Sequence, residues 1–311
     1  MRFHRPSTRP VESGFTARPP GRIPSAQPEP HQREVCSMTT ATTGALSPGQ
    51  VDDYRRNGFL FPLDAMTADQ AASYRTKLEA FEAEYGERGS AILRSKAHLV
   101  LPWVNELIRL EPVLDAVESV LGPDLYCWGS SFFIKNPHHP GYVAWHQDAP
   151  FSSIPKGGEI ITAWIALAPS IVENGCLKVV AGTHTKEAEH TFNSDGSNML
   201  SQGQEIAVEV DENDATLIQL RPGQFSLHHQ FIFHGSGPSH SDERRIGIAV
   251  RYMKPFEREE EGNTETATLV RGSDPYGTFV PEPVPTADMA PESVAYLDEQ
   301  LVSRHGDRYR K

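Results

Sequence analysis

Two short segments of the chain combine residue types that bind metal ions. The first reads Trp145-His146-Gln147-Asp148. In an extended strand, residues two apart point to the same face, so His146 and Asp148 would project side by side. An imidazole and a carboxylate placed in this way can fill two neighbouring positions around a metal ion. The pattern is short, however, and a surface strand with a His–Asp hydrogen bond would also produce it.

A second segment, Phe233-His234-Gly235-Ser236, could supply a third metal ligand. Its histidine ends an apolar stretch at a glycine turn, where a side chain can point into a cavity. Two histidines and one carboxylate that leave coordination positions open are typical of non-haem Fe(II) oxygenases. Eleven residues after His234, Arg245 offers a planar pair of donors for a carboxylate, and Ser236 could add a hydroxyl donor. A turn histidine and an arginine paired with a surface acid are the alternative explanation.

The order of these segments resembles the phytanoyl-CoA dioxygenase-like family of Fe(II)/2-oxoglutarate oxygenases. The likeness extends over about residues 46–256 and includes SFFIK, WHQD, TAWIAL, ENGCLKVVAGTH, SLHH, FHGSGP and RRIGIAVRY. The resemblance implies three iron ligands, which are His146, Asp148 and His234. It implies four positions at the cosubstrate, which are Arg245 at the distal carboxylate, Ser236 beside it, Trp164 and, on looser spacing, Lys96.

The resemblance also implies the reaction and its cofactors. Fe(II), 2-oxoglutarate and O2 would be used to hydroxylate or otherwise oxidise a C–H bond of a small metabolite, with release of succinate and CO2. Related halogenases have a small residue at the carboxylate position, whereas this chain has Asp148, so halogenation is not expected. Family members act in pathways such as secondary metabolism, but the substrate cannot be assigned from the residues.

Two other functions remain open at this stage. A jelly-roll binding protein could keep the shape without turnover, and a cupin-type metalloenzyme could use the metal without 2-oxoglutarate. The metal ligands also have a rival, because His228 or His229 could replace His234. Otherwise these two histidines and Gln147 are candidates for the lining of the pocket.

The elements that would hold these residues are helices first and strands afterwards. Three helical stretches are predicted, between Ser47 and Gly58, between Thr67 and Gly86, and over about 103–121. Short strands rich in Val, Ile, Phe and Trp follow, at about 125–136, 142–147, 160–168, 176–180, 205–210, 215–220, 224–228 and 246–253. A weak helix is predicted at about 291–308.

This order indicates an α+β protein in which helices pack on one sheet of a double-sheet core. The family resemblance makes the expected fold more specific: a double-stranded β-helix (a cupin-like jelly roll) with N-terminal helices. We expect a single domain over 46–311, because no repeat or linker divides that range. Residues 1–45 are expected to be a disordered extension, since the first 37 hold seven prolines and six arginines. Met38 is an alternative start.

Composition restricts the partners of the protein. The chain of 311 residues has a formal net charge of −12, which argues against binding to nucleic acid. No apolar run approaches the roughly 20 residues needed to span a membrane. Three cysteines fit a reducing compartment, so we expect a cytoplasmic protein with a small-molecule substrate, and the oligomeric state stays open.

Overall fold

The computed structural model of the chain describes residues 44–149, 158–192, 196–200, 203–257 and 265–305. All of them belong to one of the two units into which the contacts divide the chain, Thr40–Lys311. The expected extension over 1–45, apart from Gly44 and Ala45, lies outside the described residues, as does Met38. The domain boundary at residue 46 therefore stays a prediction.

The helices begin and end close to the residues that the sequence marks. They are α1 (Pro48–Asn57), α2 (Ala68–Leu93), α3 (Pro102–Leu107), α4 (Glu111–Leu121) and α5 (Pro291–His305). Ser47 and Thr67 each form a capping box with the glutamine three residues later, which satisfies amide groups in the first turn. The predicted end of the second helix at Gly86 coincides with a break in α2, although α2 as a whole is longer than predicted. The backbone leaves helical angles there (φ 52°, ψ −128°), but the helix resumes and reaches Leu93.

Two antiparallel sheets form the rest of the core. The larger has the order β1 (Phe59–Asp64), β9 (Gln224–His229), β4 (Ile160–Ala166), β11 (Arg245–Met253), β2 (Leu125–Lys135), β12 (Thr266–Arg271) and β13 (Val280–Pro281), in which only the β12–β13 pair is parallel. The smaller has the order β3 (Val143–His146), β10 (Phe233–Ser236), β5 (Leu177–Val180) and β8 (Ala215–Ile218). A separate pair joins β6 (His190–Phe192) to β7 (Gln204–Ile206).

Alternation along the strands sorts the side chains of the large sheet into two layers. On β11, Ile246, Ile248 and Val250 belong to the apolar cluster that includes the helices. Their neighbour Ala249 belongs instead to the cluster between the two sheets. Trp164 on β4 shares this inner layer. The fold is thus the expected jelly roll of class α+β, and its inner layer faces the site.

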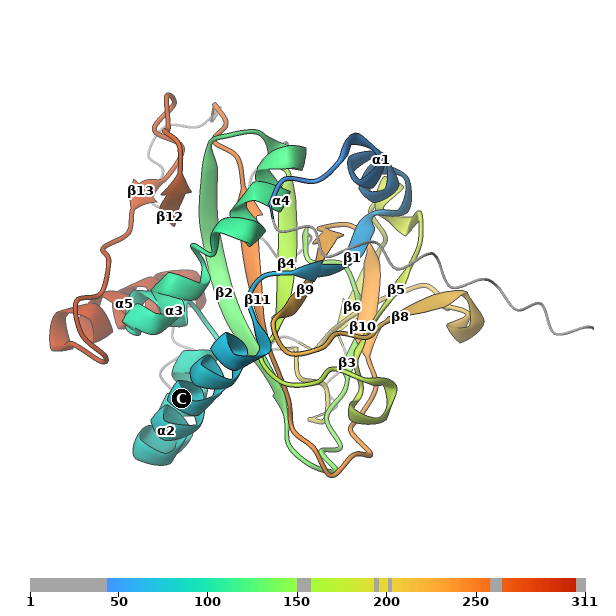
Figure 1. Cartoon of the computed structure of the whole chain (residues 1–311), viewed down its shortest axis with the longest axis horizontal. Coiled ribbons are helices and arrows are strands. Elements are labelled where there is room, and N and C mark those ends of the chain that lie inside the picture. The colour runs from blue at the N-terminus through green and yellow to red at the C-terminus, as the bar shows by residue number, and fades with distance from the viewer. Residues whose placement is uncertain (1–43, 150–157, 193–195, 201–202, 258–264, 306–311) are drawn as a thin grey trace, which may run out of the picture. The chain divides into compact units, whose positions relative to one another are not determined.

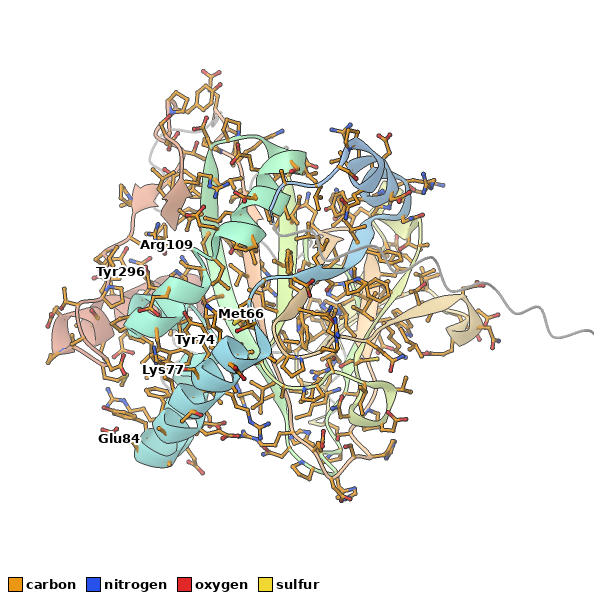
Figure 2. The ribbon with its side chains drawn as sticks, viewed as in Figure 1. Met66, Tyr74, Lys77, Glu84, Arg109 and Tyr296 are labelled. Carbon is orange, nitrogen blue, oxygen red and sulfur yellow. The ribbon has the colours of Figure 1, made fainter. Side chains whose placement is uncertain are left out.

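The helices cover the opposite face of the large sheet. In Figure 1, α2, α3 and α5 lie on the side of β2 away from the smaller sheet. Tyr74 and Lys77 on α2, labelled in Figure 2, both reach Glu106 on α3: the tyrosine donates a hydrogen bond at 3.2 Å and the ammonium lies 3.9 Å away. Among the described residues, no helix is long and apolar enough to cross a membrane.

Several regions of the sheets differ from the sequence prediction, which did not include β6, β12 or β13. Strand β1 was not predicted, because Pro62 interrupts its pattern, and its pairing with β9 is irregular between Leu60 and Leu63. Strand β7 covers Gln204–Ile206 only, and it pairs outside the two main sheets. The expected strand over 205–210 therefore contributes little to the jelly roll.

Candidate metal centre

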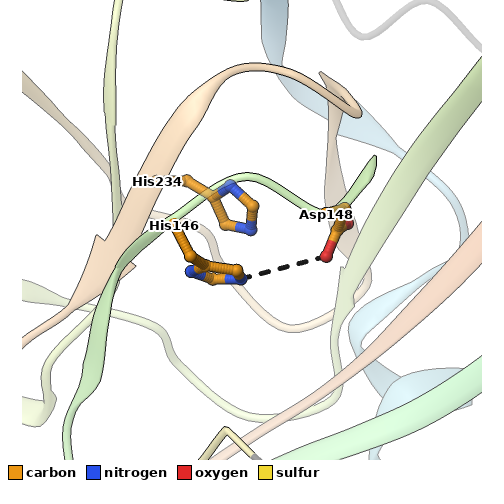
Figure 3. Close-up of side chains that lie close together, drawn as sticks. All are labelled: His146, Asp148 and His234. Carbon is orange, nitrogen blue, oxygen red and sulfur yellow. Dashed lines mark ion pairs between the residues drawn. The ribbon is translucent and has the colours of Figure 1, made fainter. Parts of the chain in front are cut away.

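His146, Asp148 and His234 meet between the two sheets. One nitrogen or oxygen atom from each lies within 4.8 Å of the others. His146 is the last residue of β3 and pairs with His234 of β10, so the two imidazoles lie 3.9 Å apart between ring centroids. Asp148 lies just beyond the end of β3, and its Oδ1 is 3.8 Å from Nε2 of His146 (Figure 3).

Backbone hydrogen bonds orient both imidazoles for metal binding. Nδ1 of His146 donates to the carbonyl of Ala144 at 2.9 Å, and Nδ1 of His234 donates to the carbonyl of Ile232 at 3.0 Å. Because a carbonyl can only accept, the proton lies on Nδ1 and the lone pair on Nε2 faces the site. Burial lowers the pKa of His146 to about 4 and that of His234 well below its usual value. Both rings are therefore neutral near pH 7, as a metal ligand must be.

The environment of Asp148 keeps its carboxylate ionised. Burial is the largest single influence and would raise the pKa of Asp148, but Arg251, His228 and the other two histidines together outweigh it, and the pKa lies well below its usual value. Arg251 is 3.3 Å from Oδ1, and the hydroxyl of Thr162 donates to Oδ2 at 2.9 Å. Two neutral nitrogens and one anionic oxygen thus face a common point, which fits a divalent cation such as Fe(II).

A cavity that is partly open to solvent adjoins this cluster. Apolar side chains form much of its wall. It is lined by Phe133, Val143, His146, Asp148, Thr162, Trp164, Leu177, His228, His234, Ser236, Arg245, Ala249 and Arg251. The cavity therefore combines the three candidate ligands with a surface that can enclose a small molecule.

Three of the four residues expected at the cosubstrate line this cavity. The guanidinium of Arg245 lies over the ring of Trp164, 5.5 Å from the centroid. Arg245 is 2% exposed, and its Nη1 donates to the carbonyl of Gly175. Its Nε is buried without a hydrogen-bond partner among the described residues. A buried arginine with a free donor at the wall of a pocket fits the carboxylate of a ligand.

The fourth residue, Lys96, is engaged elsewhere. Its ammonium forms a buried ion pair with Glu282 and donates to the carbonyl of Thr266 at 2.9 Å. Lys96 does not line the cavity. We therefore leave it out of the cosubstrate site: its charge is neutralised by a carboxylate that joins the C-terminal segment to the loop before α3.

Of the three candidate pocket residues, only His228 lines the cavity. His228 lines the cavity, 3.8 Å from Oδ2 of Asp148, and its Nδ1 is buried without a hydrogen-bond partner among the described atoms. Gln147 points away and binds the carbonyl of Lys186 at 2.8 Å and the amide of Ala188 at 2.8 Å. His229, next to His228 on the strand, faces away from the cavity and packs on the ring of His184.

Sequence reasoning missed two polar residues of the cavity wall and a third behind it. Arg251 and Thr162 contact Asp148, and Lys135 contacts Ser236. A signal for Arg251 existed, since it lies six residues after Arg245 on one strand and therefore shares its face. Lys135 pairs with Arg245 across β2 and β11, a register that only the fold reveals.

Comparison with known proteins agrees with this geometry. The model of the phytanoyl-CoA dioxygenase (PhyH) family matches residues 54–247. The mouse protein named phytanoyl-CoA dioxygenase domain-containing protein 1 is 30% identical over 131 residues, which are 40% of this chain and 44% of that protein. A Stutzerimonas stutzeri protein named "Probable alpha-ketoglutarate-dependent hypophosphite dioxygenase" is 28% identical over 176 residues, 55% of this chain and 60% of that protein. The chain thus spans about half the length of these relatives.

Among solved structures, that of "non-heme monooxygenase; ThoJ apo" is similar over most of both chains. It is 30% identical, with a TM-score of 0.71, and the match covers 82% of this chain and 95% of that one. The similarity therefore extends well beyond the residues of the metal cluster.

Proposed function

The chain belongs to the phytanoyl-CoA dioxygenase family, and from this premise we propose that it is a non-haem Fe(II)/2-oxoglutarate-dependent dioxygenase. Its reaction is the oxidation, in the simplest case the hydroxylation, of a C–H bond in a small metabolite. The main support is one observation: His146, Asp148 and His234 converge on the same cavity that receives the partly unpaired guanidinium of Arg245.

In this proposal the cluster binds iron and the far end of the cavity binds 2-oxoglutarate. Nε2 of His146, Nε2 of His234 and the carboxylate of Asp148 hold the metal. Fe(II) bound there, with 2-oxoglutarate and O2, would supply the oxidation, in which 2-oxoglutarate is converted to succinate and CO2, one oxygen atom of O2 enters succinate and the other enters the substrate. Arg245 and Ser236 bind the distal carboxylate of the cosubstrate, and Trp164 forms the wall beside it.

The remaining residues of the cavity wall bind and orient the substrate. Phe133, Val143 and Leu177 give the cavity apolar walls, which exclude water from the reacting groups. His228 has a buried nitrogen that can bond to a polar group of the substrate. Because Asp148 fills the third ligand position, we propose oxidation and not halogenation.

The substrate is proposed as a small metabolite, of the kind found in catabolic or secondary metabolism. The name of the Stutzerimonas relative states alpha-ketoglutarate, which is 2-oxoglutarate, as its cosubstrate. We also propose that the protein binds neither nucleic acid nor membranes. The net charge of −12 supports the first part of this proposal. A cytoplasmic location is proposed from its three cysteines.

Thermal unfolding of the full chain with Mn(II), a redox-inert substitute for Fe(II), tests this function. We expect Mn(II) to raise Tm, and 2-oxoglutarate to raise it further only when the metal is present. Asp148→Ala should lose both effects, and Arg245→Met should lose only the second. A rise with Mn(II) and none with 2-oxoglutarate would instead indicate the cupin-type enzyme. Release of succinate by the Fe(II) protein in air would exclude the inactive binding protein.

A further inference from the structure

Lys135 is a buried lysine that lies behind the wall of the cavity. Its side chain is fully buried, and it is the last residue of β2, directly opposite Arg245 of β11. Opposite residues of an antiparallel pair project from the same face, so both cations point into the space between the sheets. Lys135 itself does not line the cavity. Its role therefore depends on the residues to which it is hydrogen-bonded.

The amine of Lys135 forms hydrogen bonds to residues at the end of β10. It donates to Oγ of Ser236 at 2.7 Å and to the carbonyl of Gly237. Once a bound carboxylate favours the protonated form of this amine, the ammonium is only a donor, so Oγ of Ser236 must then accept this bond. The hydroxyl hydrogen of Ser236 then remains to donate toward the cavity that this serine lines. Lys135 thereby fixes the direction in which Ser236 donates.

Within the described part of the chain, no acidic side chain forms an ion pair with Lys135 or Arg245. Among the described residues, the charged groups that affect the pKa of Lys135 are Arg245, Cys176 and Lys178, and none is a carboxylate. Burial raises the pKa of the Cys176 thiol to about 11, so it is neutral at pH 7. Burial, and then Arg245, lowers the pKa of Lys135 to about 6. In the free protein at pH 7 this amine is therefore mostly neutral, and a ligand carboxylate bound beside Arg245 would favour its protonated form.

We propose that Lys135 is a positioning residue for the distal carboxylate of the cosubstrate. It orients the Ser236 hydroxyl and adds a second positive charge behind it, so that the site selects a 2-oxo dicarboxylate over a 2-oxo monocarboxylate. This inference rests on the proposed function, because it assigns a role at the same cosubstrate end of the cavity. It extends that proposal, since Arg245 alone would account for binding but not for the buried lysine.

The test compares two ligands that differ only at the distal end. Affinities of the full-length Mn(II) protein are measured by titration calorimetry for 2-oxoglutarate and for 2-oxopentanoate, which lacks the distal carboxylate. In Lys135→Met we expect the affinity for 2-oxoglutarate to fall about tenfold or more. The affinity for 2-oxopentanoate should stay as in the wild type, so the preference for the dicarboxylate shrinks by the same factor.

Two controls separate this role from a structural one. Lys178→Met removes a positive charge from the same region, outside the cavity wall, and should leave the preference unchanged. Without ligand, Lys135→Met should be at least as stable as the wild type, because it replaces a buried polar amine, whose protonated form has no anion beside it, with an apolar side chain. Lys135→Gln, which can still donate to Ser236 but has no charge, should show an intermediate preference and provides the measurement if the methionine variant does not fold.

Each result has a definite meaning. An unchanged preference for 2-oxoglutarate in Lys135→Met or Lys135→Gln overturns the inference. If the free variant is also less stable than the wild type, Lys135 has a structural role. If the wild type binds Mn(II) but neither ligand, the proposed function fails together with the inference. If the wild type binds 2-oxoglutarate and the Lys135 variants bind both ligands as tightly as the wild type does, the function stands and the role of Lys135 is wrong.

Discussion

Gly247 allows the ring of Trp164 to lie flat against the inner face of the large sheet. It is on β11, two residues after Arg245, and a Cβ atom placed there would come within 2.1 Å of Cζ2 and 2.3 Å of Cη2 of Trp164. Carbon atoms pack at about 3.5 Å, so in Gly247→Ala the indole would have to move by about 1.4 Å. The ring also lies beneath Arg245, so the movement would disturb the proposed binding site for 2-oxoglutarate.

We expect two effects of Gly247→Ala. Overpacking of this kind costs about 1–3 kcal/mol in the free energy of unfolding. In a domain of this size it would lower Tm by roughly 2–4 °C for each kcal/mol. The affinity for 2-oxoglutarate should fall about tenfold, which corresponds to about 1.4 kcal/mol of lost binding free energy. The affinity for Mn(II) alone should not change, because the indole is not a metal ligand.

Urea unfolding and calorimetric titration of the Mn(II) protein measure these quantities. Gly129→Ala on β2 is the matched control, since a Cβ there meets nothing within 4 Å. Its stability and its affinity for 2-oxoglutarate should remain close to the wild type. If Gly247→Ala binds 2-oxoglutarate as tightly as the control does, the placement of the cosubstrate against Trp164 and Arg245 is refuted.

Two further predictions concern residues outside the cavity. Glu282→Gln should lower the free energy of unfolding at pH 7 by roughly 3–5 kcal/mol, because Lys96 loses the carboxylate with which it is buried. Burial alone would raise the pKa of Glu282, but His98 and Lys96 hold it far below its usual value. The stability of the wild type should therefore be complete above about pH 4.3 and decline below it, and urea unfolding across this range should show a smaller decline in Glu282→Gln. Gln147→Ala should lose roughly 1–3 kcal/mol, because its side chain holds the backbone at Lys186 and Ala188. It should keep its affinity for 2-oxoglutarate, and a loss of affinity at normal stability would return Gln147 to the pocket.

Much of the site was predictable because its signals are local. His146 and Asp148 are two residues apart, and the turn after His234 fixes where that histidine lies. The ends of the first helix were equally readable, since Ser47 and Gly58 act within one turn of the backbone. Patterns of this kind depend on neighbouring residues and survive in almost any tertiary context.

The missed features depend on residues that are far apart in the sequence. Lys96 finds its partner Glu282 186 residues later, so the sequence did not reveal that its charge was already neutralised. Lys135 meets Ser236 only because β2 and β10 lie on opposite sheets of the jelly roll. Strand β1 is held in the large sheet by its pairing with β9, although Pro62 interrupts the strand pattern of its sequence. In each case tertiary pairing outweighed the local pattern.

The most direct test of the central claim is the anaerobic absorption spectrum of the full chain with Fe(II), before and after addition of 2-oxoglutarate. We predict a weak visible charge-transfer band that requires both components and is lost in His146→Ala and in Arg245→Ala. Folded wild-type protein that shows no band at saturating Fe(II) and 2-oxoglutarate would contradict the proposed iron–cosubstrate site. A band that persists in His146→Ala would contradict the assignment of the metal ligands.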